Sequence, residues 1–321
     1  MPKHDSLLDT LARLRVLENE PLTDATRDEL LRALGHQNNV IIARAADIMG
    51  RSGDTNFIQP LLERAERLFG QGTDADKQCR GKEAIVTALD ALGNTWEAIY
   101  LRGIRWVQME PVFGGRADTA ANLRGLCVQA LARMDHPDAH FELETLLVDR
   151  EMPARVAAVN ALTYLGDEKS ELLLRFKALI GDEEPPVAAA CFAGLLTIAP
   201  ERSVPFVAGF LTSADSDLAE RAALALGESR LPEAFAALRR CWEDLVDFTF
   251  RKTLLLAIGL VRSEESFNFL LAVVRDEGRS AALRALEALA IYAAEERRRE
   301  QIREAVEASG DAKVREAYQA M

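Results

Sequence analysis

Aromatic side chains are scarce in this sequence, although apolar ones are not. Only 6% of the 321 residues are Phe, Trp or Tyr, whereas 49% are hydrophobic, and alanine and leucine supply most of that content. Strands favour β-branched and aromatic residues, while alanine and leucine are among the best helix formers. The shortage of aromatic residues therefore argues against a β-sheet protein and favours closely packed helices.

An excess of basic charge is also missing. The formal net charge is -12 at pH 7, and the pI is about 5.0. A protein that binds duplex DNA normally carries a basic surface that displaces counterions from the phosphates. We therefore expect no nucleic-acid partner, although a local basic patch is compatible with this charge balance. An acidic surface keeps a cytosolic protein soluble and favours a basic partner.

Long hydrophobic runs and paired cysteines are absent as well. The longest nearly apolar run, residues 187–199, is interrupted by Thr197 and is too short to cross a bilayer. The first residues, MPKHDSLLDTLARLRVL, carry charges among their leucines and lack the apolar core of a signal peptide. The four cysteines lie far apart without a CxxC pair, which is typical of reduced thiols. We expect a cytoplasmic protein that does not bind membranes.

The sequence does contain a helical frame that repeats eight times. Segments such as ALDALG, which ends at Gly93, and ALTYLG, which ends at Gly166, align on their last residue, named the marker from here on. Successive markers lie 28 to 43 residues apart, a period typical of helical repeat proteins. The markers are Gly50, Gly93, Asp135, Gly166, Ala199, Gly227, Arg262 and Ala290.

The columns of this frame agree in residue size. Five residues before the marker, seven repeats have Ala and one has Gly194, and the residue directly before the marker is always large and apolar. Apolar residues at one, four, five and eight positions before the marker share one face of a helix. The small column has a physical reason, because two helix backbones approach closely only where a side chain is short. Each repeat therefore contributes a second helix that ends near its marker.

First helices are expected between these second helices. They are residues 57–69, 96–107, 139–147, 170–180, 205–211, 233–242 and 266–274. Pro205 lies in or just before a first turn, where the missing amide hydrogen has little cost. We predict an all-α fold, a right-handed α-α superhelix of about eight or nine helix pairs. Residues 1–321 form one solenoid domain, with N-terminal capping helices in 1–37, the repeats in 38–292 and a C-terminal cap in 293–321.

Two segments resemble a known family. PARVAAVNALTYLGD and LAERAALALGES are similar to the short HEAT repeats of phycobilisome-lyase-type proteins and of many bacterial scaffolds. The resemblance covers about residues 38–292 and implies an armadillo-like helical solenoid of bacterial type that binds another protein. It also implies an alternative, a lyase-like or chaperone-like protein that handles a tetrapyrrole-bearing subunit. A HEAT-like DNA glycosylase ranks last, since that class needs a basic groove with aromatic side chains around an extruded base.

A basic column runs through five of the eight repeats, eleven residues before the marker. Its members are Lys82, Arg124, Arg155, Arg251 and Arg279. In the family that the chain resembles, an arginine at this position often bonds to an acidic loop residue of a neighbouring repeat, which makes the column a structural ladder. The alternative is a basic strip along the concave wall that binds acidic segments of a partner. Both interpretations stay open at this point.

Two adjacent repeats contain insertions, which account for the two longest intervals between markers. They are GQGTDADKQCRGK, residues 70–82, and QMEPVFGGRADTA, residues 108–120, each between the first and the second helix of its repeat. Insertions on one edge of a solenoid often build its binding surface. We predict that four residues of these insertions lie together and bind the partner, namely Phe113, Arg116, Arg80 and Lys82. The alternative is that Phe113 folds back as a lid over the groove between helices.

The sequence offers no constellation for catalysis or metal binding. No GxSxG, P-loop or GxGxxG motif opens a helix, and the His-Glu dipeptides of the iron-binding HEAT-fold hydroxylases do not occur. His136 and His140 lie four residues apart, but Pro137 places His136 in a turn. Cys127 and Cys191 fall on the inward face, where we expect buried thiols. We therefore expect a non-catalytic scaffold or adaptor, without cofactor or metal, that binds another protein through its concave face and the edge built by the insertions.

Overall fold

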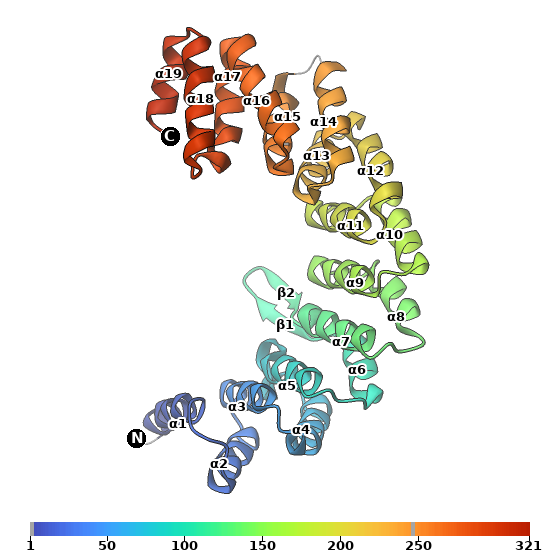
Figure 1. Ribbon diagram of the computed structural model, residues 1–321. Coiled ribbons are helices and arrows are strands. Elements are labelled where there is room, and N and C mark those ends of the chain that lie inside the picture. Colours follow the sequence, from blue (N-terminus) through green and yellow to red (C-terminus); the bar gives the residue numbers. More distant parts are fainter. Residues whose placement is uncertain (1–2, 245–247) are drawn as a thin grey trace. The chain divides into compact units, whose positions relative to one another are not determined.

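The computed structural model describes residues 3–244 and 248–321 (Figure 1). Within these residues there are nineteen α-helices and one two-stranded antiparallel hairpin. The all-α helical repeat fold predicted from the sequence is thereby confirmed. None of the described helices is long and apolar enough to span a lipid bilayer. The chain comprises two compact units, Met1–Leu165 (unit 1) and Gly166–Met321 (unit 2), and the continuous single solenoid stays a prediction.

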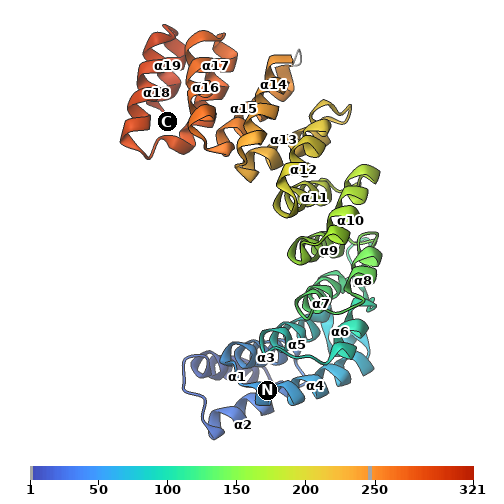
Figure 2. The same ribbon diagram turned by 45° about the vertical axis from the view of Figure 1, so that its right-hand side comes forward.

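Unit 1 consists of first and second helices in two layers, together with the hairpin. Its elements are α1 (Lys3–Leu17), α2 (Asp24–Leu34), α3 (Asn39–Ser52), α4 (Ile58–Gly70), α5 (Arg80–Ala91), α6 (Glu97–Ile104), β1 (Met109–Val112), β2 (Gly115–Asp118), α7 (Ala121–Arg133), α8 (Ala139–Leu146) and α9 (Met152–Leu165). The second helices α3, α5, α7 and α9 pack side by side, with α1 next to α3 (Figures 1 and 2). Each first helix packs on the second helix that follows it, and α2 does so on α3. The helices predicted within residues 1–37 are therefore α1 and α2.

Unit 2 repeats the same arrangement. Its helices are α10 (Glu168–Ile180), α11 (Pro185–Ile198), α12 (Pro200–Ala208), α13 (Ser216–Ser229), α14 (Pro232–Asp244), α15 (Phe248–Val261), α16 (Glu264–Asp276), α17 (Arg279–Leu289), α18 (Glu296–Ala308) and α19 (Ala312–Gln319). The second helices α11, α13, α15, α17 and α19 pack in sequence. Because α18 and α19 pair like the helices before them, residues 293–321 are built like a repeat.

The repeating frame corresponds to the second helices α3, α5, α7, α9, α11, α13, α15 and α17. Every marker lies in the last turn of its helix or within two residues after it. Every residue five or eight positions before a marker is buried. The predicted helical phase is therefore correct in all eight repeats.

Glycine at the marker position serves two different purposes. Gly93 follows α5 with a φ of +70°, the left-handed conformation with which many helices end. Gly227 instead lies within α13, where a Cβ atom would come 2.3 Å from the backbone oxygen of Ala257 on α15. Ala257 belongs to the small column, so a short residue on each helix permits this close approach.

One first helix begins earlier than predicted. The helix expected over residues 205–211 is α12, which begins at Pro200 and contains Pro205 in its interior. Pro200 occupies the first turn, where its missing amide hydrogen removes no helical hydrogen bond. The prediction chose the wrong proline, because Pro200 directly follows the preceding marker and leaves almost no connecting loop.

Candidate functional site

The first insertion is shorter than predicted, because α5 already begins at Arg80. Residues 71–79 form two short 3-10 turns, and both Gln78 and Cys79 have positive φ angles, 59° and 52°. Two successive non-glycine residues in this region cost on the order of 1–3 kcal/mol each. Surrounding contacts hold them, since Cys79 is completely buried and the Gln78 amide donates to Glu110 Oε1 at 2.6 Å.

A buried carboxylate anchors this insertion to the start of α5. Asp76 Oδ1 accepts the backbone N–H of Gly81 at 2.7 Å, and Oδ2 accepts that of Lys82 at 3.0 Å. The positive end of the helix dipole favours a carboxylate at this place. Asn39 Nδ2, from the start of α3, also donates to Oδ1 at 3.1 Å. The carboxylate therefore connects the second helices of two consecutive repeats.

Lys82 is enclosed by this cluster and does not reach the surface. Its side chain is 1% exposed, and Nζ lies 3.1 Å from Asp76 Oδ2 and 3.2 Å from Gln108 Oε1. The rings of Trp106 and Phe69 lie 5.3 Å and 5.9 Å from Nζ, within the range of cation–π attraction. The expectation that Lys82 faces a partner is therefore wrong, because Asp76 supplies the counter-charge that lets the ammonium group be buried.

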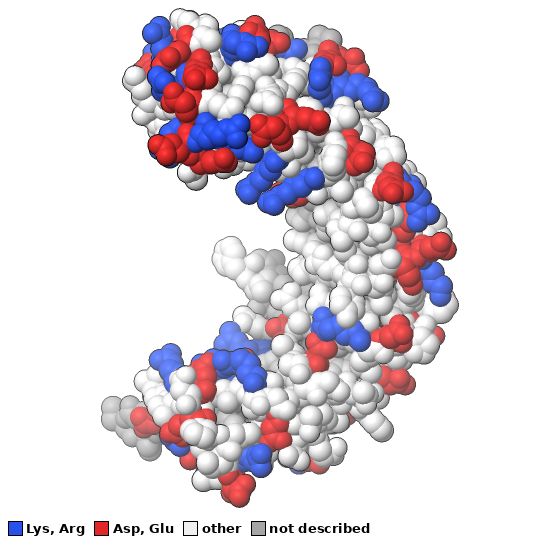
Figure 3. Space-filling view, in the orientation of Figure 1, with Lys and Arg blue, Asp and Glu red and all other residues white. Residues whose placement is uncertain are grey.

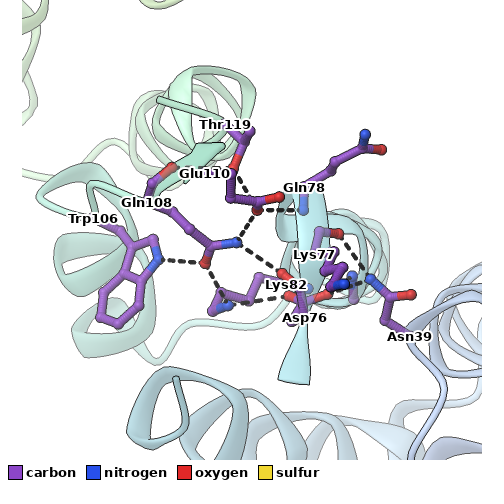
Figure 4. Close-up of polar contacts among 10 residues, drawn as sticks. Asn39, Asp76, Lys77, Gln78, Lys82, Trp106, Gln108, Glu110 and Thr119 are labelled. Carbon is purple, nitrogen blue, oxygen red and sulfur yellow. Dashed lines mark hydrogen bonds and ion pairs between the residues drawn. The ribbon is translucent and has the colours of Figure 1, made fainter. Parts of the chain in front are cut away.

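Glu110 and Gln108 fasten the hairpin to the first insertion (Figure 4). Gln108 Nε2 donates to the backbone oxygen of Asp76 at 2.8 Å and to Glu110 Oε1 at 2.6 Å. The same oxygen of Glu110 accepts Thr119 Oγ1 at 2.8 Å and the amide of Gln78. Burial alone would raise the pKa of Glu110, but these hydrogen bonds hold it below its usual value. The two insertions therefore touch, and they form one braced cluster.

The hairpin presents its turn to solvent. Val112 pairs with Gly115, which leaves Phe113 and Gly114 as a two-residue turn, and Gly114 has a φ of +90°. Phe113 is fully exposed, at 108% of its reference area. The lid alternative is therefore wrong, since Phe113 covers no groove. Arg116 is exposed on β2 and donates across the hairpin to the backbone oxygen of Met109 at 2.8 Å.

Arg124 is a structural residue of the hairpin base. It is 4% exposed, and its guanidinium donates to both carboxylate oxygens of Asp149 at 2.8 Å and to Asp118 Oδ2 at 2.7 Å. Asp149 lies in the connection between α8 and α9, in the next repeat, which is the arrangement of a ladder. Expecting Arg124 to contact a partner is therefore wrong. A two-coordinate guanidinium–carboxylate pair is among the stronger hydrogen-bonded contacts.

The rest of the basic column divides between structural contacts and a cavity wall. Arg155 is 9% exposed and donates to the backbone oxygens of Asp149 and Arg150 at 2.8 and 3.1 Å, so it too does not face a partner. In unit 2, Arg279 pairs with Asp311 at 2.7 Å, and the Arg251 guanidinium lies 4.9 Å from the Trp242 ring centre. Arg251 and Arg279 nevertheless line one cavity of about 610 Å³ together with Lys252 and Arg284. No continuous strip joins the column in unit 1.

The largest hollow of unit 1 is a groove on the second helices, here named the unit-1 groove. It has a volume of about 720 Å³ and is lined by α1, α3, α5 and one residue of α7. Basic side chains gather over these helices (Figure 3). The basic residues of the lining are Arg15, Arg44, Arg51 and Arg80. Only Arg80 was predicted as a binding residue, because Arg15 lies outside the repeating frame and nothing in its local sequence distinguishes it.

The arginines of the unit-1 groove differ in their partners. Arg44 and Arg51 both form ion pairs with Glu18, the latter at 2.6 Å. Arg15 and Arg80 are exposed and form no ion pair or side-chain hydrogen bond with any residue that the structure describes. Glu83 also lines this groove, one turn after Arg80, and burial followed by the nearby Asp76 charge raises its pKa to about 7.

The cysteines are buried and poorly suited to act as nucleophiles. All four are free thiols, and burial raises the pKa of Cys79 and Cys191 to about 12. A reactive cysteine needs the opposite shift, toward the thiolate. Among residues 3–244 and 248–321, no group of three metal-ligating side chains comes together. His136 precedes α8 and lies 3.0 Å from Glu97, while His140 lies within α8.

A family model of HEAT repeats matches residues 172–253, which run from α10 into α15. The pairs α10–α11 and α12–α13, which carry the repeating frame, fall within this range. The chain contains HEAT repeats. The frame extends over second helices on both sides of the matched range, and its insertions fall in two repeats of unit 1. No curated protein matches the sequence.

Several solved structures of helical proteins are similar to this HEAT-repeat chain, each with 16% sequence identity. Human deoxyhypusine hydroxylase aligns over 80% of this chain and 98% of its own, with a TM-score of 0.31. An engineered protein aligns over 99% and 95%, with a TM-score of 0.38. The CpcE and CpcF complex of phycocyanin lyase from Nostoc sp. PCC7120 aligns over 91% and 96%, with a TM-score of 0.34. At this level of similarity no activity, substrate or partner is inferred.

Proposed function

We propose that this chain is a non-catalytic adaptor that binds another protein with the hairpin of unit 1, and that Phe113 is the anchor of the interface. The observation that carries the proposal is a fully exposed phenylalanine at the tip of a braced hairpin. Binding energy in protein interfaces is concentrated in a few residues, and large apolar or aromatic side chains inserted into a pocket often provide it.

The bracing of the hairpin supports this proposal. A two-stranded hairpin is at best marginally stable by itself in water. Here the strands are held by the bonds of Gln108 and Glu110 to the first insertion and by the buried pair of Asp118 with Arg124. A loop fixed in its binding conformation loses less entropy when a partner binds. The buried polar groups therefore serve to hold an exposed apolar tip in place.

Photo-crosslinking in the cells from which the protein comes tests the proposal. Benzoylphenylalanine replaces Phe113 in one variant and Phe141 in a matched control, since Phe141 is also exposed, at 69%, but lies on α8. We expect a discrete crosslinked protein from position 113 that position 141 does not yield. The double change Phe113→Ala and Arg116→Ala should then weaken binding of that protein at least tenfold, about 1.4 kcal/mol, with an unchanged far-ultraviolet spectrum.

Two results would contradict the adaptor function. One is the same pattern of crosslinks from positions 113 and 141, or none from position 113. The other is a captured protein that binds the double variant as tightly as it binds the unchanged chain. A double variant that melts several degrees lower would mean that Phe113 stabilises the fold rather than an interface.

A further inference from the structure

The unit-1 groove follows the whole exposed face of two neighbouring helices. It runs from Val40 to Arg51 on α3 and from Arg80 to Ala91 on α5. At 1.5 Å per residue this is a length of roughly 16 Å, enough for about three turns of a helix or five extended residues. The first insertion leads directly into Arg80, so the groove starts beside the base of the hairpin.

The floor of the groove is apolar and low. Ala43, Gly50, Ala84 and Ala88 line it, while Leu11 of α1 and Leu126 of α7 contribute to its walls. Short side chains leave the space that a partner's larger apolar side chains would fill. The small residues alone do not indicate a ligand, and the charges above them supply the second observation.

The charges that line the groove are mainly basic, in a chain whose formal net charge is -12. Four arginines face two acidic residues, Asp47 and Glu83. Glu18 already neutralises Arg44 and Arg51, whereas Arg15 and Arg80 form no ion pair with any described residue. Opposite charge is attracted to such a site, and the attraction also sets the direction in which a partner approaches.

We propose that the unit-1 groove binds an acidic, amphipathic segment of a partner protein. The apolar side of the segment lies on the floor formed by Ala43, Ala84 and Ala88, and its carboxylates pair with Arg15 and Arg80. Arginine suits this role because its planar guanidinium binds a carboxylate through two hydrogen bonds. The inference rests on the proposed function and names the chemistry of the partner that unit 1 recognises.

A protein segment fits this groove better than a nucleic acid. Proteins that bind single strands offer aromatic side chains on which bases stack, and no residue lining the groove is aromatic among those the structure describes. Asp47 and Glu83 would repel a phosphate backbone, whereas an amphipathic segment avoids them by presenting apolar side chains there. The groove therefore favours a few well-placed carboxylates over a uniform row of negative charges.

Selection from a random peptide library on the full chain tests the inference. The probe is a phage-displayed library of peptides of about 12 residues, a length that spans the groove as a helix. We expect the selected peptides to contain two or more Asp or Glu residues spaced among apolar ones. Their affinity should fall at least tenfold in the double variant Arg15→Ala and Arg80→Ala, and it should also fall as salt is added. Arg67→Ala is the matched control, because Arg67 is exposed on α4 and does not line the groove.

The outcomes separate this inference from the proposed function of the hairpin. Phe113→Ala should leave peptide binding unchanged, because the peptide is captured by the groove and not by the hairpin tip. An unchanged melting temperature of the double arginine variant shows that any lost binding is local. The inference is overturned if no peptide is enriched, if the enriched peptides lack acidic residues, or if they bind the double variant equally well. It is also overturned if a single-stranded oligonucleotide displaces the peptides.

Discussion

Replacing Lys82 by methionine tests whether the buried charges hold the two insertions together. Methionine has a similar length and keeps contact with the rings of Phe69 and Trp106, but it removes the ammonium group 3.1 Å from Asp76. The carboxylate then stays buried with only neutral donors. These are the amides of Gly81 and residue 82 and the side chain of Asn39.

Removing one partner of a buried ion pair generally costs 3–5 kcal/mol, because the other charge remains without compensation. Since three hydrogen-bond donors still reach Asp76, we expect a loss near the lower limit, about 3 kcal/mol. For a unit of this size the melting temperature should fall by roughly 6–12 °C. The double variant Asp76→Asn with Lys82→Met removes both charges, and we expect it to recover a substantial part of the loss.

Urea unfolding followed by circular dichroism measures these free energies, with a double-mutant cycle over Asp76 and Lys82. Lys77→Met is the matched control, because Lys77 belongs to the same insertion and is exposed, and it should change stability by no more than about 0.5 kcal/mol. Equal effects of the substitutions at positions 77 and 82 would refute the reasoning. Strictly additive effects of the two changes in the cycle would refute it as well, since the pair would then have no coupling energy.

Two further predictions concern packing and pH. Gly227→Ala should destabilise unit 2 by about 2 kcal/mol because its Cβ atom would lie 2.3 Å from the backbone oxygen of Ala257, whereas Gly209→Ala, with no atom within 4 Å, should be neutral or slightly stabilising; similar melting temperatures for the two variants would contradict the packing. Because the folded pKa of Glu83 is about 7 and therefore above its ordinary value of 4.5, stability should decrease as pH rises from about 4.5 to about 7. Glu83→Gln should therefore be more stable than the unchanged chain at about pH 8, by about 1–2 kcal/mol after allowance for solvent screening, and equally stable at about pH 4. Urea melts at both pH values check this difference, and a gain at the lower pH instead would reverse the sign.

The position of the second helices could be predicted because helix formation depends on residues three and four positions apart. Ala45 and Ala88, for example, mark the same buried face in their two helices, and that periodicity is visible within one short segment. The inward orientation of Cys127 and Cys191 follows from the same periodicity. The place of the insertions and their mutual contact also follow, because adjacent repeats bring equivalent connections together.

Only the tertiary structure decided which of the predicted binding residues are accessible. Lys82 and Arg124 belong to the same sequence column as Arg279, yet they are buried because Asp76, Asp118 and Asp149 supply buried counter-charges. Burial of a charge depends on such partners, and a helical period carries no information about them.

The unit-1 groove shows the same limit of sequence reasoning. Arg15 and Arg80 come from helices 65 residues apart in the chain and meet on one surface only because α1, α3 and α5 pack side by side. Periodicity within a helix reports which face is buried, and so it predicts the helices and their phase. The charge of a groove arises from side chains of several helices, and therefore only their packing determines it.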